Sequence, residues 1–158
     1  SIMKAKLSAF LFLFFLICYS QNDNNEDELK NLRASYMSYL TAEGYMPSMD
    51  DDLDIKFKSE GTTYYIIVKP GDSFTLSRIF ANSDGCQERI TKSLNRLNSR
   101  YRNITAFHSE DNCKSVTIEC NSWLKDKDDW KGKVFKFSLS SLKNAEASVG
   151  EYLEEFKN

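Results

Sequence analysis

The chain of 158 residues is 41% hydrophobic and 28% charged, a composition that suits one globular domain and leaves no room for a second core. Its formal net charge at pH 7 is only -2. Proteins that bind nucleic acids normally carry a clear basic excess, so this balance argues against a nucleic-acid partner.

Residues 1–20 differ in kind from the rest of the chain. Lys4 and Lys6 precede a mainly apolar run from Leu7 to Ile17, and a polar stretch begins at Gln21. This layout is typical of a secretory signal peptide, with cleavage expected after Ser20. The run is too short to cross a bilayer core of about 30 Å, so a retained anchor is the weaker alternative and no membrane span is expected after cleavage. The sequence therefore predicts a secreted or periplasmic protein.

A polar leader and a helix are expected next. Residues 21–27 are rich in Asn and Asp, lack periodicity and are predicted to be disordered, so the folded domain is expected over residues 28–158. Apolar residues then recur at helical spacing, and Gly44 follows as a candidate C-cap, which predicts a helix from about Glu26 to Glu43. The recurring residues are Leu29, Leu32, Tyr36 and Leu40.

Three strands in a meander follow the first helix. The alternation of Leu53, Ile55 and Phe57 with polar residues predicts a strand whose apolar side chains face the core. A Ser-Glu-Gly-Thr turn and a Pro-Gly-Asp turn separate it from two β-rich runs, Tyr64–Val68 and Phe74–Phe80.

The segment Asp84–Arg102 is the clearest predicted helix, with one apolar and one basic face. Guanidinium groups on one helix face can clamp carboxylates or phosphates, so the basic face is a candidate anion site. The alternative is an ordinary solvated face that pairs with acidic neighbours. The apolar face comprises Ile90, Leu94, Leu97 and Tyr101, and the basic face comprises Arg89, Lys92, Arg96 and Arg100.

A second hairpin and a last helix complete the predicted fold. Strands are expected at Ile104–His108 and Ser115–Asn121. Further on, Phe135–Leu139 alternates like a strand, whereas the apolar residues from Leu142 to Phe156 recur as in a helix. The local pattern leaves open whether Phe135–Leu139 is strand or helix.

Three cysteines remain after signal cleavage, so at most one internal disulfide can form. Cys113 and Cys120 lie on one expected extended segment, roughly 23 Å apart, which is far beyond bridging distance. Any bridge must therefore join Cys86 to Cys113 or to Cys120. The alternative for Cys120 is a buried free thiol, because it is in phase with Val116 and Ile118.

The acidic residues and the single histidine offer no complete reactive site. Asp50, Asp52 and Asp54 have the spacing of calcium-loop ligands, but Ile55 replaces the turning Gly and Gly61 stands in place of the bidentate Glu. These carboxylates are expected to be solvent-exposed residues just before a strand.

His108, beside Ser109 and Glu110, suggests a Ser-His-acid set, but no nucleophile turn accompanies it. With no second histidine and no Cys-x-x-Cys pair, a metal site is not expected either. The sequence predicts no catalytic residues, no metal and no cofactor, and therefore a protein that is not an enzyme.

Four aromatic residues could line a peptide groove, although aromatic side chains on strands more often belong to the core. They are Tyr64, Tyr65, Trp123 and Trp130, of which Tyr65 and Trp123 are taken as binding candidates.

Four local features accompany this order of elements: Asp54-Ile55-Lys56-Phe57-Lys58, Glu60-Gly61, an aromatic pair before Ile66, and Trp123 before an acidic stretch. Together with the order of elements, they resemble the YbjN-like family of bacterial proteins. The resemblance covers roughly residues 28–157. It implies the α+β fold of type III secretion chaperones: an antiparallel sheet of about five strands in the order α-β-β-β-α-β-β-α, and a helical end from Asp128 to Phe156. Because those chaperones are dimers that hold extended segments of partner proteins, the resemblance also implies a homodimer.

These observations lead to one expected function and one alternative. The expected function is that of an exported, non-enzymatic domain that binds a protein or peptide through its sheet. The alternative is a module that binds small anions or lipids through Arg89, Lys92, Arg96 and Arg100.

Overall fold

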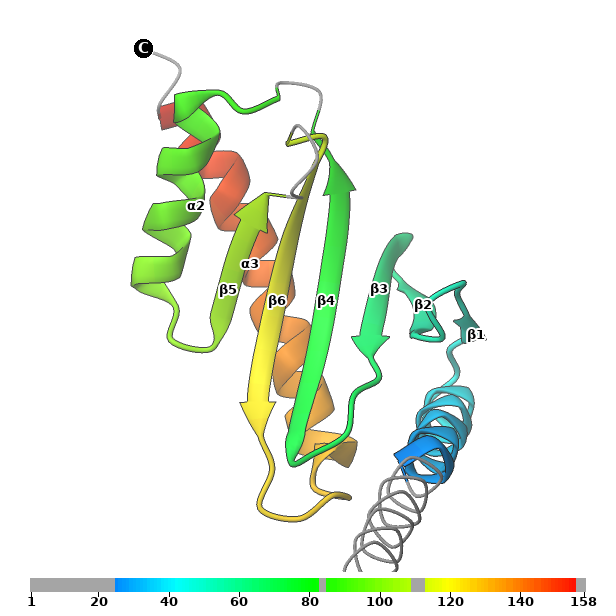
Figure 1. Cartoon of the computed structure of the whole chain (residues 1–158). Coiled ribbons are helices and arrows are strands. Elements are labelled where there is room, and N and C mark those ends of the chain that lie inside the picture. The colour runs from blue at the N-terminus through cyan, green and yellow to red at the C-terminus, as the bar shows by residue number, and fades with distance from the viewer. Residues whose placement is uncertain (1–24, 83–84, 109–112, 156–158) are drawn as a thin grey trace, which may run out of the picture.

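The computed structural model describes residues 25–82, 85–108 and 113–155. The predicted signal peptide, the first part of the polar leader, Ser109 and Glu110 lie outside these ranges. One antiparallel sheet has the strand order β1-β2-β3-β4-β6-β5, and the described helices pack on one of its faces (Figure 1). The strands are β1 (Ser48–Met49), β2 (Ile55–Ser59), β3 (Thr62–Ile67), β4 (Ser73–Ala81), β5 (Ile104–His108) and β6 (Ser115–Trp123), and the helices are residues 25–42, α2 (Glu88–Arg100) and α3 (Phe135–Glu155).

The α+β class is confirmed, with one strand more than the sequence indicated. The additional strand, β1, pairs with β2 only through Ser48↔Lys56 and Met49↔Ile55. Two residues are too few to show a period-two pattern, so the sequence could not reveal it. Pro47 precedes β1 and has no N–H to extend the ladder, which accounts for the short pairing.

The helix of residues 25–42 confirms the one expected from about Glu26 to Glu43, but the extent of the leader and the position of Leu53 differ from expectation. Residues 25–27, assigned to the leader from composition, belong to the helix of residues 25–42. Leu53 was expected in the core but is 45% exposed, whereas Ile55 and Phe57 are buried as predicted. The Leu53 N–H donates to the Asp50 carbonyl at 3.2 Å, which places Leu53 in a turn before β2 and outside the strand's alternation.

The core lies between the sheet and the helices. Paired residues on neighbouring strands share a sheet face, and one row of them crosses five strands on the helix side: Ile55, Ile66, Leu76, Cys120 and Ile104. All five are buried. Near the N-terminal helix the Trp130 ring stacks on Phe74 at 5.8 Å and meets Tyr36 edge-on at 4.6 Å. These contacts join the first helix to the sheet and to the segment before α3.

Helices α2 and α3 both begin later than predicted. Gln87 is extended at the start of α2 and follows Cys86, which is held in a disulfide, so the helix starts at Glu88 rather than Asp84. The segment Phe135–Leu139 is helical: Phe135 and Leu139 are buried four residues apart, and Phe137 is 58% exposed. The final helix begins at Phe135 rather than Asp128 because Gly132, with φ 65°, breaks the helical path just before it.

Candidate functional site

Among the described residues, no helix covers the sheet face opposite the core (Figure 1). One row of register partners crosses all six strands on this face, running Ser48, Lys56, Tyr65, Ser77, Glu119 and Thr105. Next to it, Ile79 on β4 and Phe107 on β5 both pair with Thr117 on β6. We call Tyr65, Ser77, Ile79, Thr105, Phe107, Thr117 and Glu119 the open face.

Two of the large exposed hydrophobic side chains lie together on the open face. Ile79 is 41% exposed and Phe107 is 42% exposed, on either side of the buried Thr117. Neighbouring strands lie about 4.8 Å apart, so these two side chains stand two strand spacings from each other. They form a short apolar strip bordered by the polar row.

The sheet edges are poorly suited to accept a further strand. At the β5 edge, Asn98 of α2 donates from Nδ2 to the Ala106 carbonyl at 2.9 Å and accepts from the Ala106 N–H at 2.7 Å. At the other edge, β1 pairs with Lys56 and Ile55, which leaves only the last three residues of β2 without an outer neighbour. Short or capped edges resist strand addition, so the open face offers more binding surface than either edge.

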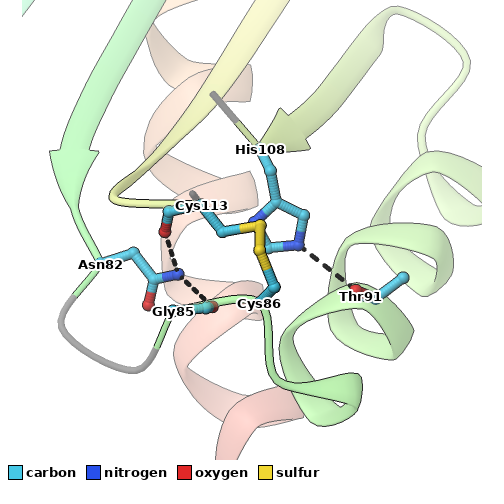
Figure 2. The surroundings of a disulfide bond; sticks show 6 residues. All are labelled: Asn82, Gly85, Cys86, Thr91, His108 and Cys113. Atoms are coloured by element: carbon cyan, nitrogen blue, oxygen red, sulfur yellow. Dashed lines mark hydrogen bonds between the residues drawn. A yellow bond between two sulfur atoms is a disulfide. The ribbon is translucent and has the colours of Figure 1, made fainter. Parts of the chain in front are cut away.

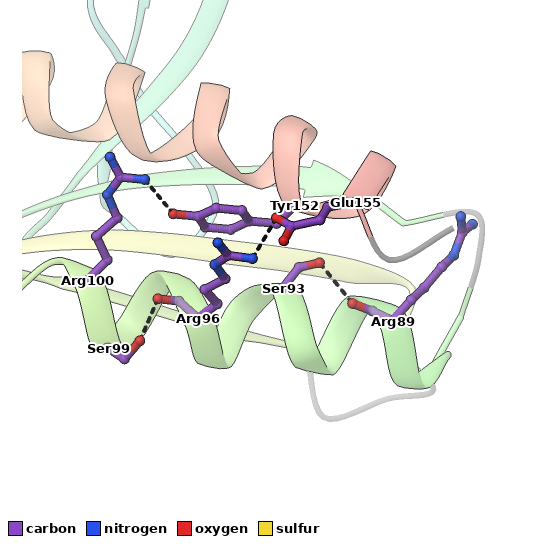
Figure 3. Close-up of polar contacts among 7 residues, drawn as sticks. All are labelled: Arg89, Ser93, Arg96, Ser99, Arg100, Tyr152 and Glu155. Atoms are coloured by element: carbon purple, nitrogen blue, oxygen red, sulfur yellow. Dashed lines mark hydrogen bonds and ion pairs between the residues drawn. The ribbon is translucent and has the colours of Figure 1, made fainter. Parts of the chain in front are cut away.

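The predicted basic face of α2 lies partly against α3. Arg96 forms an ion pair with Glu155 at 2.5 Å, and its guanidinium lies 4.6 Å from the Tyr152 ring centroid (Figure 3). Arg100 donates to the Tyr152 hydroxyl at 2.8 Å. The hydrogen bond that Arg96 donates to Glu155 is the main cause that raises the pKa of Arg96, and the one that Arg100 donates to Tyr152 is the main cause for Arg100. Both arginines therefore serve the packing of α2 on α3.

The other two basic candidates contact residues at the start of their own helix. Arg89 donates from Nε to the Gln87 side-chain oxygen at 2.8 Å, and Lys92 pairs with Glu88 at 2.9 Å. In Figure 3 the Arg89 side chain extends away from Tyr152, at the opposite end of α2 from Arg100. The four side chains thus do not converge on one point.

The four aromatic candidates do not form a groove. Tyr64 and Trp130 are buried in the core. Tyr65 is half-buried on the open face, whereas Trp123, at the end of β6, pairs with Ser73 and is 88% exposed. Trp123 is six residues along β6 from Thr117, about 20 Å away, so it lies outside the apolar strip.

A disulfide joins Cys86, just before α2, to Cys113, just before β6, with 5.1 Å between their Cα atoms (Figure 2). Asn82 supports the bridge by donating from Nδ2 to the carbonyls of Gly85 and Cys113, each at 2.7 Å. Of the two pairings that the sequence left open, the structure contains the one with Cys113. Cys120 is a buried free thiol whose pKa is raised by burial.

The acidic residues near β2 shape the backbone. Asp50 accepts from the N–H groups of Asp52 and Asp54 through one carboxylate oxygen, and Asp54 accepts from the Val68 N–H at 2.6 Å. Burial is the main cause that raises the pKa of Asp54. These contacts tie the turn before β2 to the end of β3.

His108 lies near the disulfide, with Nε2 3.3 Å from the Thr91 hydroxyl (Figure 2).

Within the described ranges, no three His, Cys, Asp or Glu side chains are grouped so that they could hold a metal ion. The helices within those ranges include none long and apolar enough to span a membrane.

A solved archaeal protein has the same fold. It is an uncharacterized protein from Methanothermobacter thermautotrophicus, 13% identical, with a TM-score of 0.54, and the match covers 78% of this chain and 97% of that one. A second match is YbjN from E. coli, with 10% identity, a TM-score of 0.48 and coverage of 77% and 88%.

No family model matches the chain, and no curated protein matches it. At 13% identity, the likeness to the protein from Methanothermobacter thermautotrophicus shows a shared fold and nothing beyond it.

Sequence reasoning did not single out Ile79, Phe107, Lys56 or Lys58. The alternation in Ile55-Lys56-Phe57-Lys58 could have shown that both lysines lie on the sheet face opposite the core. For Ile79 and Phe107 the signal was weaker, since an apolar residue in a predicted strand is normally assigned to the core. Only the strand register shows that both lie on the open face, on either side of Thr117.

Proposed function

We propose that the protein is an exported, non-enzymatic domain that binds an extended protein segment across its open face. The observation that carries the proposal is the exposed apolar pair Ile79 and Phe107 on a sheet face that no described helix covers. Binding surfaces commonly place a few apolar anchors inside a polar surround. Tyr65, Thr105 and Glu119 provide such a surround on the same face.

The sheet edges and the basic helix are less suitable as the main contact surface. Asn98 caps the β5 edge, and β1 covers part of the β2 edge. On α2, Arg96 and Arg100 contact Glu155 and Tyr152 of α3, so an anion at that surface would compete with these contacts. The anion-binding alternative on α2 is therefore not proposed.

Export is the second part of the proposal. It is supported by the signal-peptide pattern of residues 1–20 and by the Cys86–Cys113 disulfide, because disulfides persist in oxidising compartments. The location that follows is the periplasm or the extracellular space.

Selection of peptides by the purified mature domain tests the binding proposal. Peptides from a random displayed library should bind the wild-type domain, and Ile79→Ser or Phe107→Ser should weaken the selected peptides by about tenfold or more. Phe137→Ser is the matched control, because Phe137 is an exposed phenylalanine on α3 rather than on the sheet. Failure to select any peptide, or equal effects of Phe107→Ser and Phe137→Ser, would contradict the proposal.

A further inference from the structure

A hollow of about 590 Å³ lies where the loop after the first helix meets β1, β2 and β3. It combines aromatic and thioether groups with two lysines, and no carboxylate of the described part of the chain lines it. Its volume falls within the range of about 300–1,000 Å³ typical of small-molecule sites. The lining residues are Gly44, Tyr45, Met46, Ser48, Lys56, Phe57, Lys58, Thr63 and Tyr65.

The two lysines reach the hollow from the same side of β2. They flank Phe57, whose side chain is buried in the core, so their own side chains project from the opposite face about 7 Å apart. Lys56 pairs with Tyr65 and Lys58 pairs with Thr63 across the β2–β3 ladder. The ion pairs found among the described residues include neither lysine.

The apolar part of the hollow is held in place on one side and open on the other. The Tyr45 ring is fixed by edge contacts with Phe57 at 5.1 Å and Phe135 at 5.9 Å. Met46 is 92% exposed, so its thioether stands at the mouth. Aromatic rings and sulfur favour contact with a further aromatic ring.

We propose that this hollow binds a small aromatic carboxylate, with the carboxylate between Lys56 and Lys58 and the ring against Tyr45, Tyr65 and Met46. Charge complementarity decides the class of ligand: two ammonium groups on one face, without a carboxylate in the lining, favour an anion. The hollow shares Tyr65 with the open face but contains neither Ile79 nor Phe107, so variants at those two residues test peptide binding without altering the lining of the hollow.

Titration with 2-naphthoate and its neutral isostere 2-naphthamide tests the site in the mature protein. We expect saturable fluorescence changes with naphthoate and at least about tenfold weaker binding of the amide. Lys56→Met/Lys58→Met should lower naphthoate affinity to the level of the amide. Lys92→Met is the matched control and should have no effect, because Lys92 pairs with Glu88 on α2.

A second variant keeps the test valid if the double variant does not fold. Met46→Asp changes a side chain that is almost fully exposed, so folding is spared, and it places a negative charge at the mouth. It should weaken naphthoate about tenfold more than it weakens the amide, because both ligands lose the Met46 contact but only the acid is repelled by the added charge. No binding of naphthoate, equal binding of acid and amide, or unchanged affinity in Met46→Asp would overturn the proposal. Loss of naphthoate binding in Phe107→Ser would overturn its assignment to this hollow.

Discussion

The side-chain amide of Asn98 makes two hydrogen bonds with the backbone of Ala106, one through each polar atom of the amide. It thereby acts as a one-residue extension of the sheet at the β5 edge. The exposed edge of a sheet invites pairing with other chains, and a side chain that occupies it limits such pairing. This contact is one reason why we assign binding to the open face.

Replacement of Asn98 by Ala should destabilise the fold, because it leaves the N–H and C=O groups of the buried Ala106 without their partner. An unsatisfied buried group costs about 1–3 kcal/mol, and urea unfolding of both proteins measures the difference. Asn95→Ala is the matched control, since Asn95 is an exposed residue of the same helix and the change gives the same gain in helix propensity. Equal stabilities of the two variants would show that the Asn98 contact contributes nothing.

The Cys86–Cys113 disulfide should contribute about 2–4 kcal/mol to the free energy of unfolding, because it closes a loop with a sequence separation of 27 residues. Thermal or urea unfolding with and without reductant measures this contribution. Reductant should destabilise the wild-type protein and have no effect on Cys86→Ala/Cys113→Ala. An equal response of both proteins would argue against the bridge.

Asp54 should make stability fall as pH rises above the ordinary aspartate pKa of about 4. Burial raises its pKa in the folded protein, so in the window between the unfolded and folded values the folded state holds more protons. Deprotonation across this window therefore favours unfolding. Asp54→Asn keeps an acceptor for the Val68 N–H and should remove this part of the pH dependence. Unfolding curves at several pH values check it, and an unchanged slope in Asp54→Asn would contradict the assignment.

Export predicts a defined mature N-terminus. Expressed with its own residues 1–20 in a bacterium that has a periplasm, the protein should be recovered from the periplasm or medium and begin at Gln21. Intact mass and N-terminal sequencing provide the measurement. Recovery of the uncleaved chain in the cytoplasm would contradict export.

The fold was predictable where a pattern is local. Alternation in Ile55 and Phe57 and helical spacing in Ile90, Leu94 and Leu97 identified β2 and α2, and all five residues are buried. The two-residue strand β1 is too short to show a periodic pattern. Leu53 fits the alternating pattern of β2 in the sequence, but in the structure it lies in the turn before that strand. The local pattern also could not decide whether Phe135–Leu139 is a strand or a helix. In the structure the segment is helical, and Phe135 packs against Tyr39, Tyr45 and Phe57.

The candidate site was less predictable because it depends on neighbours distant in sequence. The basic spacing on α2 was visible, but Tyr152 and Glu155, which engage Arg100 and Arg96, lie more than 50 residues further along the chain. In the same way, Ile79 and Phe107 become neighbours only through their shared partner Thr117. Sequence alone supplied the residue types, and the strand register supplied their arrangement.

The most direct test of the central claim is to locate a selected peptide on the protein by backbone-amide chemical-shift mapping. The account predicts that the largest shifts occur on β4, β5 and β6 around Ile79, Phe107 and Thr117. Shifts concentrated instead on α2, between Arg89 and Arg100, would contradict it and would place the binding surface on the helix side of the sheet.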